Sequence, residues 1–396
     1  MKKVIINLGL IYILFSNILF SIFEFPQIIS YWDEIIEIIV IMIGILLLKS
    51  KIQKKYFISI LIIVIILICG LVGNIIFNYV QIEKYIFRDV LGFLKFPITF
   101  LILKTYNFDE TISKYIDEKF IYCMKFMIIV IFVFGVLSLF IDIGMSQNEI
   151  RHGIRPYQFL FSHPTYLVQV ALFLLLFLDS SNKNNFIYSF MLLMIIVLTM
   201  RTKGIGVVAV YVFMKYAGIY FKKYKIICFI GGILVLYSST IQKVQLYASY
   251  SSSPREALYK GSLFLANKLF PFGSGFASFA SHISAKSNSK VYDYINIPYY
   301  WVENGNQYAV LGDAGFAYYI GQFGYFAFIA FLFFLYRLYK LSLDNIQNKF
   351  PIQILWLYVI IALTSESILI NNGIELCFMF LILCGLIKKR EDVKEI

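Results

Sequence analysis

The sequence has little charge and few of the residues that hold metals or form disulfides. Asp, Glu, Lys and Arg make up 15% of the 396 residues, whereas soluble globular proteins carry about 25%. The three histidines lack the spacing of a zinc motif. All five cysteines lie within apolar runs: Cys69, Cys123, Cys228, Cys377 and Cys384. The sequence therefore predicts no disulfide framework, no metal site and no cofactor.

Apolar residues make up 60% of the chain, which is more than a soluble core of this size can bury. A membrane-spanning helix needs about 20 mainly apolar residues. Twelve ranges approach this requirement: about 4–22, 35–48, 57–78, 86–103, 120–141, 163–178, 186–200, 204–221, 226–241, 315–336, 352–370 and 373–387. We therefore expect an all-α integral membrane protein with about 12 transmembrane helices.

The formal net charge of +12 is explained by a multi-pass topology. With a cytoplasmic N-terminus, 20 of the 35 Lys and Arg residues fall in short inside segments, as the positive-inside rule requires. An even number of spans also places both basic termini in the cytoplasm. The lipid bilayer is therefore the expected partner of these charges, and nucleic acid is not.

A loop of about seventy residues, 242–314, interrupts the pattern of short connections. It divides the chain into helices 1–9 (1–241), an extracytoplasmic loop (242–314), and helices 10–12 with a cytoplasmic tail (315–396). Within the loop, Ser253-Pro254-Arg255-Glu256 has the pattern of a helix N-cap. We expect this helix to run to about Leu269 and to lie against the membrane surface.

Five cations fall on the outer face, where the positive-inside rule disfavours them. Arg151 and Arg155 would share one face if their segment were helical, and Arg201 and Lys203 lie in a turn between two spans. Arg255 sits at a helix N-terminus, where a cation opposes the helix dipole unless an anion binds nearby. We interpret the five as a site for a lipid diphosphate. The alternative is an ordinary solvated loop, or contacts with lipid phosphates.

Three outer residues are candidates for proton transfer, namely Asp313, Glu366 and His282. Asp313 is the first choice because it lies at the junction of the loop with the next span. Each carboxylate would serve equally well as the counter-ion of an arginine, and a lone loop histidine is usually just solvated. Lys95 falls near the middle of the predicted 86–103 span, so we expect it to face the interior in a structural ion pair.

Five short motifs occur in the order found in the O-antigen ligase and polysaccharide polymerase superfamily, which the chain resembles over about 150–370. They are Arg155 with His163-Pro164, Met200-Arg201-Thr202-Lys203-Gly204, Arg255 with Pro271-Phe272-Gly273-Ser274-Gly275-Phe276, Gly312-Asp313-Ala314-Gly315 with Phe323-Gly324, and Ser365-Glu366-Ser367. The resemblance implies a GT-C-like, metal-independent glycosyltransferase of the bacterial cytoplasmic membrane. Its donor and acceptor would be undecaprenyl-diphosphate-linked glycans, joined into O-antigen or capsular polysaccharide.

By this resemblance Arg201, Arg255 and Arg155 would hold the diphosphate, and a chain-length regulator and a flippase would be protein partners. Ligases of the superfamily carry a His-Asn motif before the span that follows the loop. The corresponding stretch, 302–308, contains no histidine, which favours a polymerase. The alternatives are a polysaccharide ligase, a flippase or other transporter, and a structural or sensory membrane protein.

Overall fold

The structure is a computed structural model that describes residues 2–23, 31–47, 54–151, 153–181, 185–217, 254–295 and 311–395. Within these ranges the chain is helical, and its only β-type pairings are two isolated bridges. The helices are α1 (Lys2–Ile22), α3 (Trp32–Leu47), α4 (Lys54–Phe77), α5 (Glu83–Thr105), α6 (Phe108–Tyr115), α7 (Glu118–Leu137), α8 (Pro164–Ser180), α9 (Phe186–Leu198), α10 (Thr202–Val212), the π-helical turn η1 (Phe213–Ala217), α13 (Pro254–Lys268), α14 (His282–Lys286), α15 (Val291–Tyr294), α18 (Gly315–Ser342), α19 (Phe350–Leu363), α20 (Ile368–Asn371) and α21 (Gly373–Glu395).

Eleven of the twelve predicted ranges overlap described helices, although 218–221 at the end of one range is not described, and the twelfth range, 226–241, lies outside the described residues. Four helices are long and apolar enough to cross a membrane: Lys3–Ile22, Tyr56–Phe77, Glu118–Leu137 and Gly315–Ser342. The predicted range 352–370 is not one continuous helix, because α19 ends at Leu363 and the short α20 begins at Ile368. This break exposes the 364–367 segment as a turn rather than as part of a span.

Helices of two kinds build the bundle. Nearly every residue of α8 is buried, and so is the apolar part of α21, so both lie in the core. On α4 and α7, by contrast, large apolar side chains such as Ile75 and Phe126 are 80% and 64% exposed. Because water would not tolerate such a surface, these helices are the ones suited to face lipid. α18 packs against α4 and α13, and α21 packs against α5 and α6.

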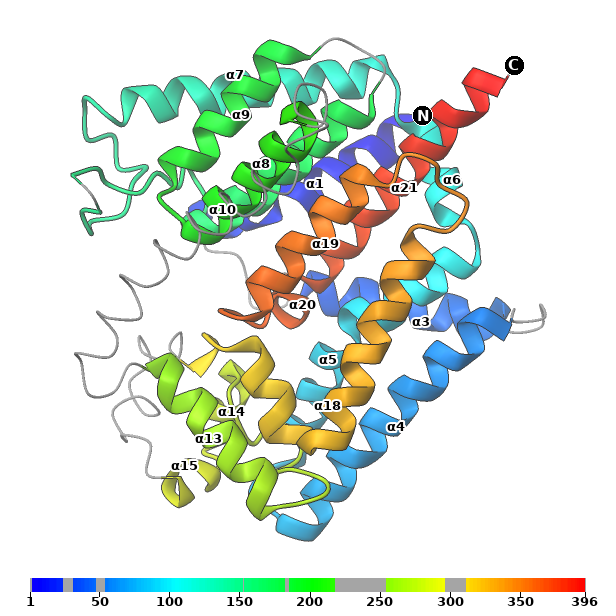
Figure 1. Ribbon diagram of the computed structural model, residues 1–396, viewed down its shortest axis with the longest axis vertical. Helices are drawn as coiled ribbons and strands as arrows, with labels where there is room; N and C mark the ends of the chain where they lie inside the picture. The colour runs from blue at the N-terminus through cyan, green and yellow to red at the C-terminus, as the bar shows by residue number, and fades with distance from the viewer. Residues whose placement is uncertain are drawn as a thin grey trace.

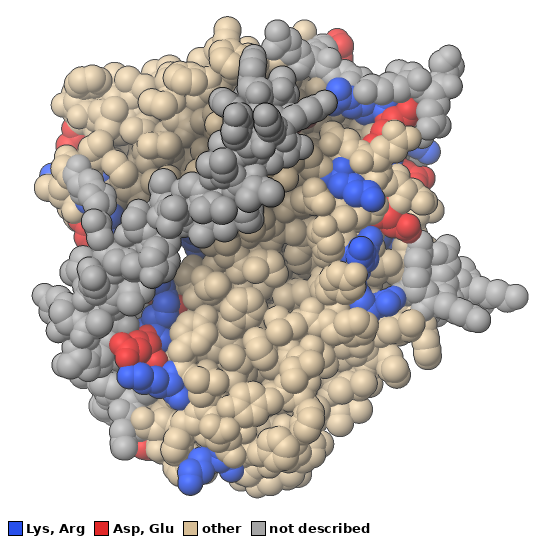
Figure 2. Space-filling model, in the orientation of Figure 1, with Lys and Arg blue, Asp and Glu red and all other residues tan. Residues whose placement is uncertain are grey.

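Charged side chains gather along two opposite flanks of the molecule, with a broad uncharged face between them (Figure 2). One flank carries α13 and α20, and the other carries α6 and the end of α21 (Figure 1). Following the predicted topology, we call the flank with Asp313 and Glu366 the outer end. The flank with Lys104 and Lys388 is the inner end.

The predicted loop helix exists, but it does not use its apolar face as we expected. α13 spans Pro254–Lys268, and its Leu258, Leu265 and Ala266 are completely buried. They pack within the protein beside α18, where the Tyr325 hydroxyl also donates to Asn267 Oδ1 at 3.0 Å. These apolar residues therefore do not face lipid as we expected, because α18 covers them. Its N-cap residue Ser253 lies outside the described residues.

The turn after α13 forms hydrogen bonds with α18 at the point where that helix is interrupted. Gly324 has φ +74° and ψ −179°, so the helical hydrogen bonding of α18 is interrupted there. The freed carbonyl oxygens of Gly321 and Gln322 accept hydrogen bonds from the amides of Ser274 and Gly275 at 2.9 and 2.8 Å. Backbone of this kind is tolerated at membrane depth only where protein satisfies it. The turn thereby fixes the loop to the bundle.

The glycines of this turn are required by its geometry. Gly273 and Gly275 have φ of +70° and +87°, and a Cβ on Gly275 would lie 2.5 Å from the backbone nitrogen of Asn74. Asn74 of α4 also binds the next residue through both side-chain atoms, because Nδ2 donates to the Phe276 carbonyl and Oδ1 accepts from the Phe276 amide. The turn is thus clamped between α4 and α18.

Candidate functional site: a cation cluster at the outer end

The turn between α9 and α10 presents two cations at the outer end. α9 ends at Leu198, and Met200 adopts a left-handed φ of +51°, which reverses the chain before α10 begins at Thr202. Gly204 lets α10 approach α8 closely, since a Cβ there would lie 2.8 Å from Val168 Cγ1. Arg201 therefore stands at the N-cap position of α10. The positive end of that helix dipole adds to its own charge.

Arg201 is a partly buried guanidinium whose described partners are neutral. Its Nη2 atom donates to Gln147 Oε1 at 2.8 Å and to His163 Nε2 at 2.9 Å. Its buried Nε atom has no hydrogen-bond partner, and no carboxylate of the described residues lies within 4.0 Å of it. Burial and the nearby Arg151 lower the pKa of Arg201 to about 10. Such desolvation without a counter-ion favours an incoming anion.

His163 is held neutral at this site. Burial first, and then the charges of Arg201 and Lys203, lower its pKa to about 4. His163 Nδ1 lies 3.3 Å from the Thr165 amide nitrogen and Nε2 lies 2.9 Å from Arg201 Nη2, but a neutral imidazole has one acceptor nitrogen and accepts at only one of them. Because a guanidinium can only donate, the shorter contact assigns that acceptor to Nε2. His163 therefore orients Arg201 without neutralising its charge.

The other two central cations are paired with the candidate carboxylates. Lys203 forms an ion pair with Glu366 Oε1, and both side chains are largely buried. Burial lowers the pKa of Lys203, although the Glu366 carboxylate opposes this shift. Arg255 of α13 donates from Nε to the Asp313 carbonyl at 3.0 Å, and its Nη2 lies 3.9 Å from Asp313 Oδ2. This looser pair leaves 54% of the Asp313 side chain exposed.

The segment that carries Arg151 and Arg155 is not helical, so the two residues do not share a helix face. Arg151 instead forms a narrow bridge with Ile154, and its guanidinium pairs with Glu149 at 2.9 Å. Arg155 pairs with the exposed carboxylate of Asp142. His152 lies outside the described residues.

Four of the five predicted cations thus lie in a single outer region, where they share the carboxylates of Glu149, Asp313 and Glu366 as neighbours. We call Arg151, Arg201, Lys203 and Arg255, together with Glu149, Asp313 and Glu366, the cation cluster. Charges of this group act on the pKa of Arg201, Lys203 and Asp313 alike. Partial burial raises the pKa of Asp313, and the neighbouring guanidinium of Arg255 opposes that rise. A carboxylate with a raised pKa that water still reaches is suited to accept a proton.

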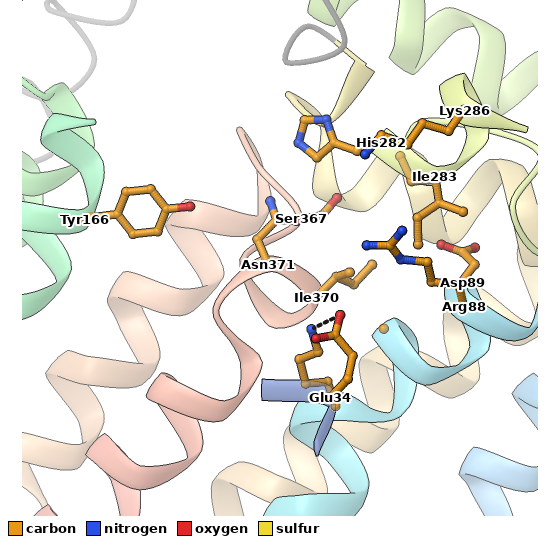
Figure 3. A pocket seen from close by; sticks show the side chains of 14 residues that line it. Glu34, Arg88, Asp89, Tyr166, His282, Ile283, Lys286, Ser367, Ile370 and Asn371 are labelled. Atoms are coloured by element: carbon orange, nitrogen blue, oxygen red, sulfur yellow. Dashed lines mark hydrogen bonds and ion pairs between the residues drawn. The ribbon is translucent and has the colours of Figure 1, made fainter. Parts of the chain in front are cut away.

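His282, the third candidate for proton transfer, lies in an adjacent cavity of about 290 Å³, which we call the outer cavity (Figure 3). Its lining comes from α5, α14, α8, the start of α3 and the segment after α19: Glu34, Arg88, Asp89, Gly92, Lys95, Tyr166, Ser281, His282, Ile283, Lys286, Gly312, Ser367, Ile370 and Asn371. The cavity and the cation cluster share two short segments, since Gly312 and Ser367 line the cavity while Asp313 and Glu366 belong to the cluster.

The prediction that Lys95 has a structural partner is confirmed. Its Nζ lies 2.6 Å from Asp33 Oδ2 and 3.4 Å from Glu34 Oε1, and only 6% of its side chain is exposed. Both carboxylates come from the start of α3, which closes the floor of the cavity. Lys95 is therefore neutralised within the protein.

Sequence reasoning did not anticipate the neutral partners of Arg201. His163 was noted only as part of a motif. Nothing in the sequence distinguished Gln147, because an amide side chain in a polar loop is usually solvated.

Among the described residues, no group of three or more His, Cys, Asp or Glu side chains is arranged to hold a metal ion. The 302–308 stretch, which bears on the choice between polymerase and ligase, lies outside the described residues. No family model, curated protein or solved structure matches the chain.

Proposed function

We propose that the chain is a membrane glycosyltransferase that polymerises lipid-diphosphate-linked oligosaccharide units, as its motifs suggest. The donor would be an undecaprenyl-diphosphate-linked glycan, whose diphosphate binds the cation cluster at the membrane surface. The product would be O-antigen or capsular polysaccharide on the outer face of the bacterial cytoplasmic membrane.

The observation that carries the proposal is the state of Arg201. Its guanidinium is partly buried, is oriented by His163 and Gln147, and has no carboxylate among the described residues as counter-ion. A structural arginine at this depth is normally paired, because burying an unpaired charge costs free energy. A diphosphate would supply the missing charge and would accept from the guanidinium in bidentate fashion.

The transfer needs one proton acceptor and one stabilised leaving group. The acceptor hydroxyl attacks the anomeric carbon of the donor, and the bond from that carbon to the diphosphate oxygen breaks with its electron pair. The departing diphosphate is held by Arg201, with Arg151 and Arg255 nearby, so the developing charge meets preformed donors. Asp313 takes the hydroxyl proton, because the carboxylate of Glu366 is already engaged by Lys203.

The predicted topology has support in the contacts between segments. At the outer end the pairs are Arg201–Gln147, Lys203–Glu366 and Arg255–Asp313, and at the inner end they are Lys104–Asp109, Lys388–Glu110 and Lys3–Asp117. Each of these pairs joins residues predicted on the same side of the membrane. We propose on this basis that the remaining apolar helices also cross the bilayer, giving about 12 spans in a GT-C-like arrangement.

The test is a polymerisation reaction with the purified protein in lipid nanodiscs and a defined lipid-diphosphate-linked repeat unit, followed by electrophoresis of the glycan. The Arg201→Gln variant should lower the rate of polymer formation about 10²–10³-fold, the usual effect of losing one donor to a developing negative charge. Arg155→Gln is the matched variant, and it should keep the wild-type ladder because Arg155 is paired with Asp142. A wild-type ladder from Arg201→Gln would refute the assignment.

One observation favours a second candidate, a proton-coupled transporter of the lipid-linked unit. Glu37 of α3 is completely buried, and both of its carboxylate oxygens lack a described hydrogen-bond partner. Buried ionisable groups at membrane depth often serve proton relays. A reconstituted flipping assay separates the two functions, because Glu37→Gln would stop transport but leave polymerisation unchanged.

A further inference from the structure

The outer cavity contains two cations, the half-buried Arg88 and the exposed Lys286, that have no carboxylate partner among the described residues. Arg88 of α5 and Lys286 of α14 line it from different elements, and no described carboxylate lies within 4.0 Å of either side-chain charge. The recorded contact of Arg88 is with the face of the Tyr31 ring, 5.0 Å from its guanidinium carbon to the ring centroid. An aromatic face attracts a cation but does not cancel its charge.

The carboxylates of the cavity, Glu34 and Asp89, have other partners than Arg88 and Lys286, although one oxygen of each has no described hydrogen-bond partner. Glu34 contacts Lys95 on the floor. Asp89 is completely buried, and its Oδ2 atom accepts from the Ala277 amide at 2.7 Å and from the Tyr318 hydroxyl at 3.1 Å. Figure 3 shows the Arg88 guanidinium directed into the space between α14 and the 367–371 segment. The positive charge of Arg88 therefore faces the open part of the cavity.

A second, independent feature indicates a ligand with hydroxyl groups. Ser367 is 3% exposed, and its Oγ atom has no described hydrogen-bond partner although it lines the cavity. Buried hydroxyls are normally paired, because an unmade hydrogen bond costs about 1–3 kcal/mol. Tyr166 and Asn371 bring further polar groups to the same wall. Together they offer both donors and acceptors, which matches a sugar better than a simple anion.

Volume limits the size of the ligand. The cavity of about 290 Å³ lies at the lower end of the range of small-molecule sites, which is about 300–1,000 Å³. That space holds one or two sugar residues and no lipid chain. Its wall at Gly312 continues directly into Asp313, the proposed proton acceptor, so a sugar bound here would stand next to the reacting groups.

We propose that the outer cavity binds an acidic sugar of the acceptor glycan, with its carboxylate or phosphate substituent on Arg88 and Lys286 and its hydroxyls on Ser367, Tyr166 and Asn371. The inference rests on the proposed function, and it adds that the repeat unit carries negative charge in addition to the carrier diphosphate. The cavity would then select the acceptor, whereas the cation cluster holds the donor.

The test measures binding of glucuronic acid to the full-length protein in lipid nanodiscs by ligand-observed NMR. Glucose is the uncharged control, and inorganic phosphate is the control for a simple anion. Glucuronic acid should bind more tightly than either control. Arg88→Gln and Lys286→Gln should each weaken its binding at least tenfold, and Arg88→Lys should restore part of it. Lys290→Gln, on the same segment but outside the cavity lining, is the matched control and should bind normally.

Several results would overturn the inference: equal binding of glucose, equal binding of inorganic phosphate, or unchanged glucuronic acid binding in a folded Arg88→Gln variant. Folding of each variant is checked by its thermal midpoint without ligand. Arg201→Gln separates the two proposals, because it should lower the rate of polymer formation about 10²–10³-fold and leave glucuronic acid binding intact. If wild-type protein binds glucuronic acid through Arg88 but forms no polymer, the cavity site stands and the proposed function fails.

Discussion

Charged side chains are paired differently at the two ends of the molecule. At the inner end, Asp109 Oδ2 lies 2.6 Å from Lys104 Nζ and 3.1 Å from Lys388 Nζ, and the Asp109 side chain is completely buried. Lys388 also reaches Glu110 at 3.0 Å. Two lysines thus meet two carboxylates in a network that joins α5, α6 and α21, although the buried Asp109 Oδ1 lacks a described hydrogen-bond partner. At the outer end, Arg201 has only neutral described partners.

This difference distinguishes charged residues that stabilise the fold from charged residues that are available to bind a ligand. A buried ion pair contributes to stability only while both partners remain, because removing one partner leaves the other unpaired. A cation without a counter-ion contributes nothing to stability in the empty protein and becomes favourable when an anion arrives. The inner network should therefore be sensitive in unfolding experiments, and the cation cluster in activity experiments.

The largest effect on stability is expected at the inner end. Asp109→Asn should lower the free energy of unfolding by about 3–5 kcal/mol, because Lys104 and Lys388 lose their shared carboxylate in a buried setting. Glu110→Gln is the matched control, and it should cost about 0–1 kcal/mol because 49% of that side chain is exposed. Thermal unfolding in detergent measures both. Similar midpoints for the two variants would show that the network is not structural.

An intermediate effect is expected from pH through His163. Its pKa is lowered from 6.5 to about 4 in the folded protein, so the unfolded chain binds more protons between these values. Stability should therefore fall as pH decreases from about 6.5 to about 4 and level off below, with a total of at most about 3 kcal/mol. His163→Gln should flatten this part of a thermal-midpoint profile. An identical pH profile in the variant would exclude His163 as its source.

The smallest effect, and one of opposite sign, is expected from Arg201→Gln. Because this change removes an uncompensated charge, the free energy of unfolding should rise by about 1 kcal/mol, as at other sites where function opposes stability. The same thermal assay applies. A loss of about 2 kcal/mol or more would mean that Arg201 belongs with the structural charges of the inner end.

Local patterns predicted the helices well, because long apolar runs leave few alternatives to a buried or lipid-facing helix. The helix expected to run to about Leu269 is present as α13, which ends at Lys268. Contacts between segments that are distant in the sequence could not be predicted from local patterns. Lys203 and Glu366 are 163 positions apart, and only the packing of α10 against α19 brings them together.

The same limit explains the error over α13 and the missed cavity. An apolar stripe on a loop helix indicates that the stripe is covered, but it does not indicate whether lipid or another helix, here α18, covers it. Arg88 lies in the predicted 86–103 span, but whether a carboxylate lies near it depends on how α14 and the start of α3 pack against α5. Unpaired charge is a property of three-dimensional packing and leaves no mark in sequence.

The break in α18 at Gly324 has a consequence for how the protein is assembled. Until the amides of Ser274 and Gly275 arrive, the carbonyl oxygens of Gly321 and Gln322 have no partner in that helix. The segment that supplies those amides is synthesised before α18, so it is already present when α18 emerges from the ribosome. Completion of α18 must therefore wait for the preceding loop to dock, and a delay in delivering that loop would stall the bundle at this step.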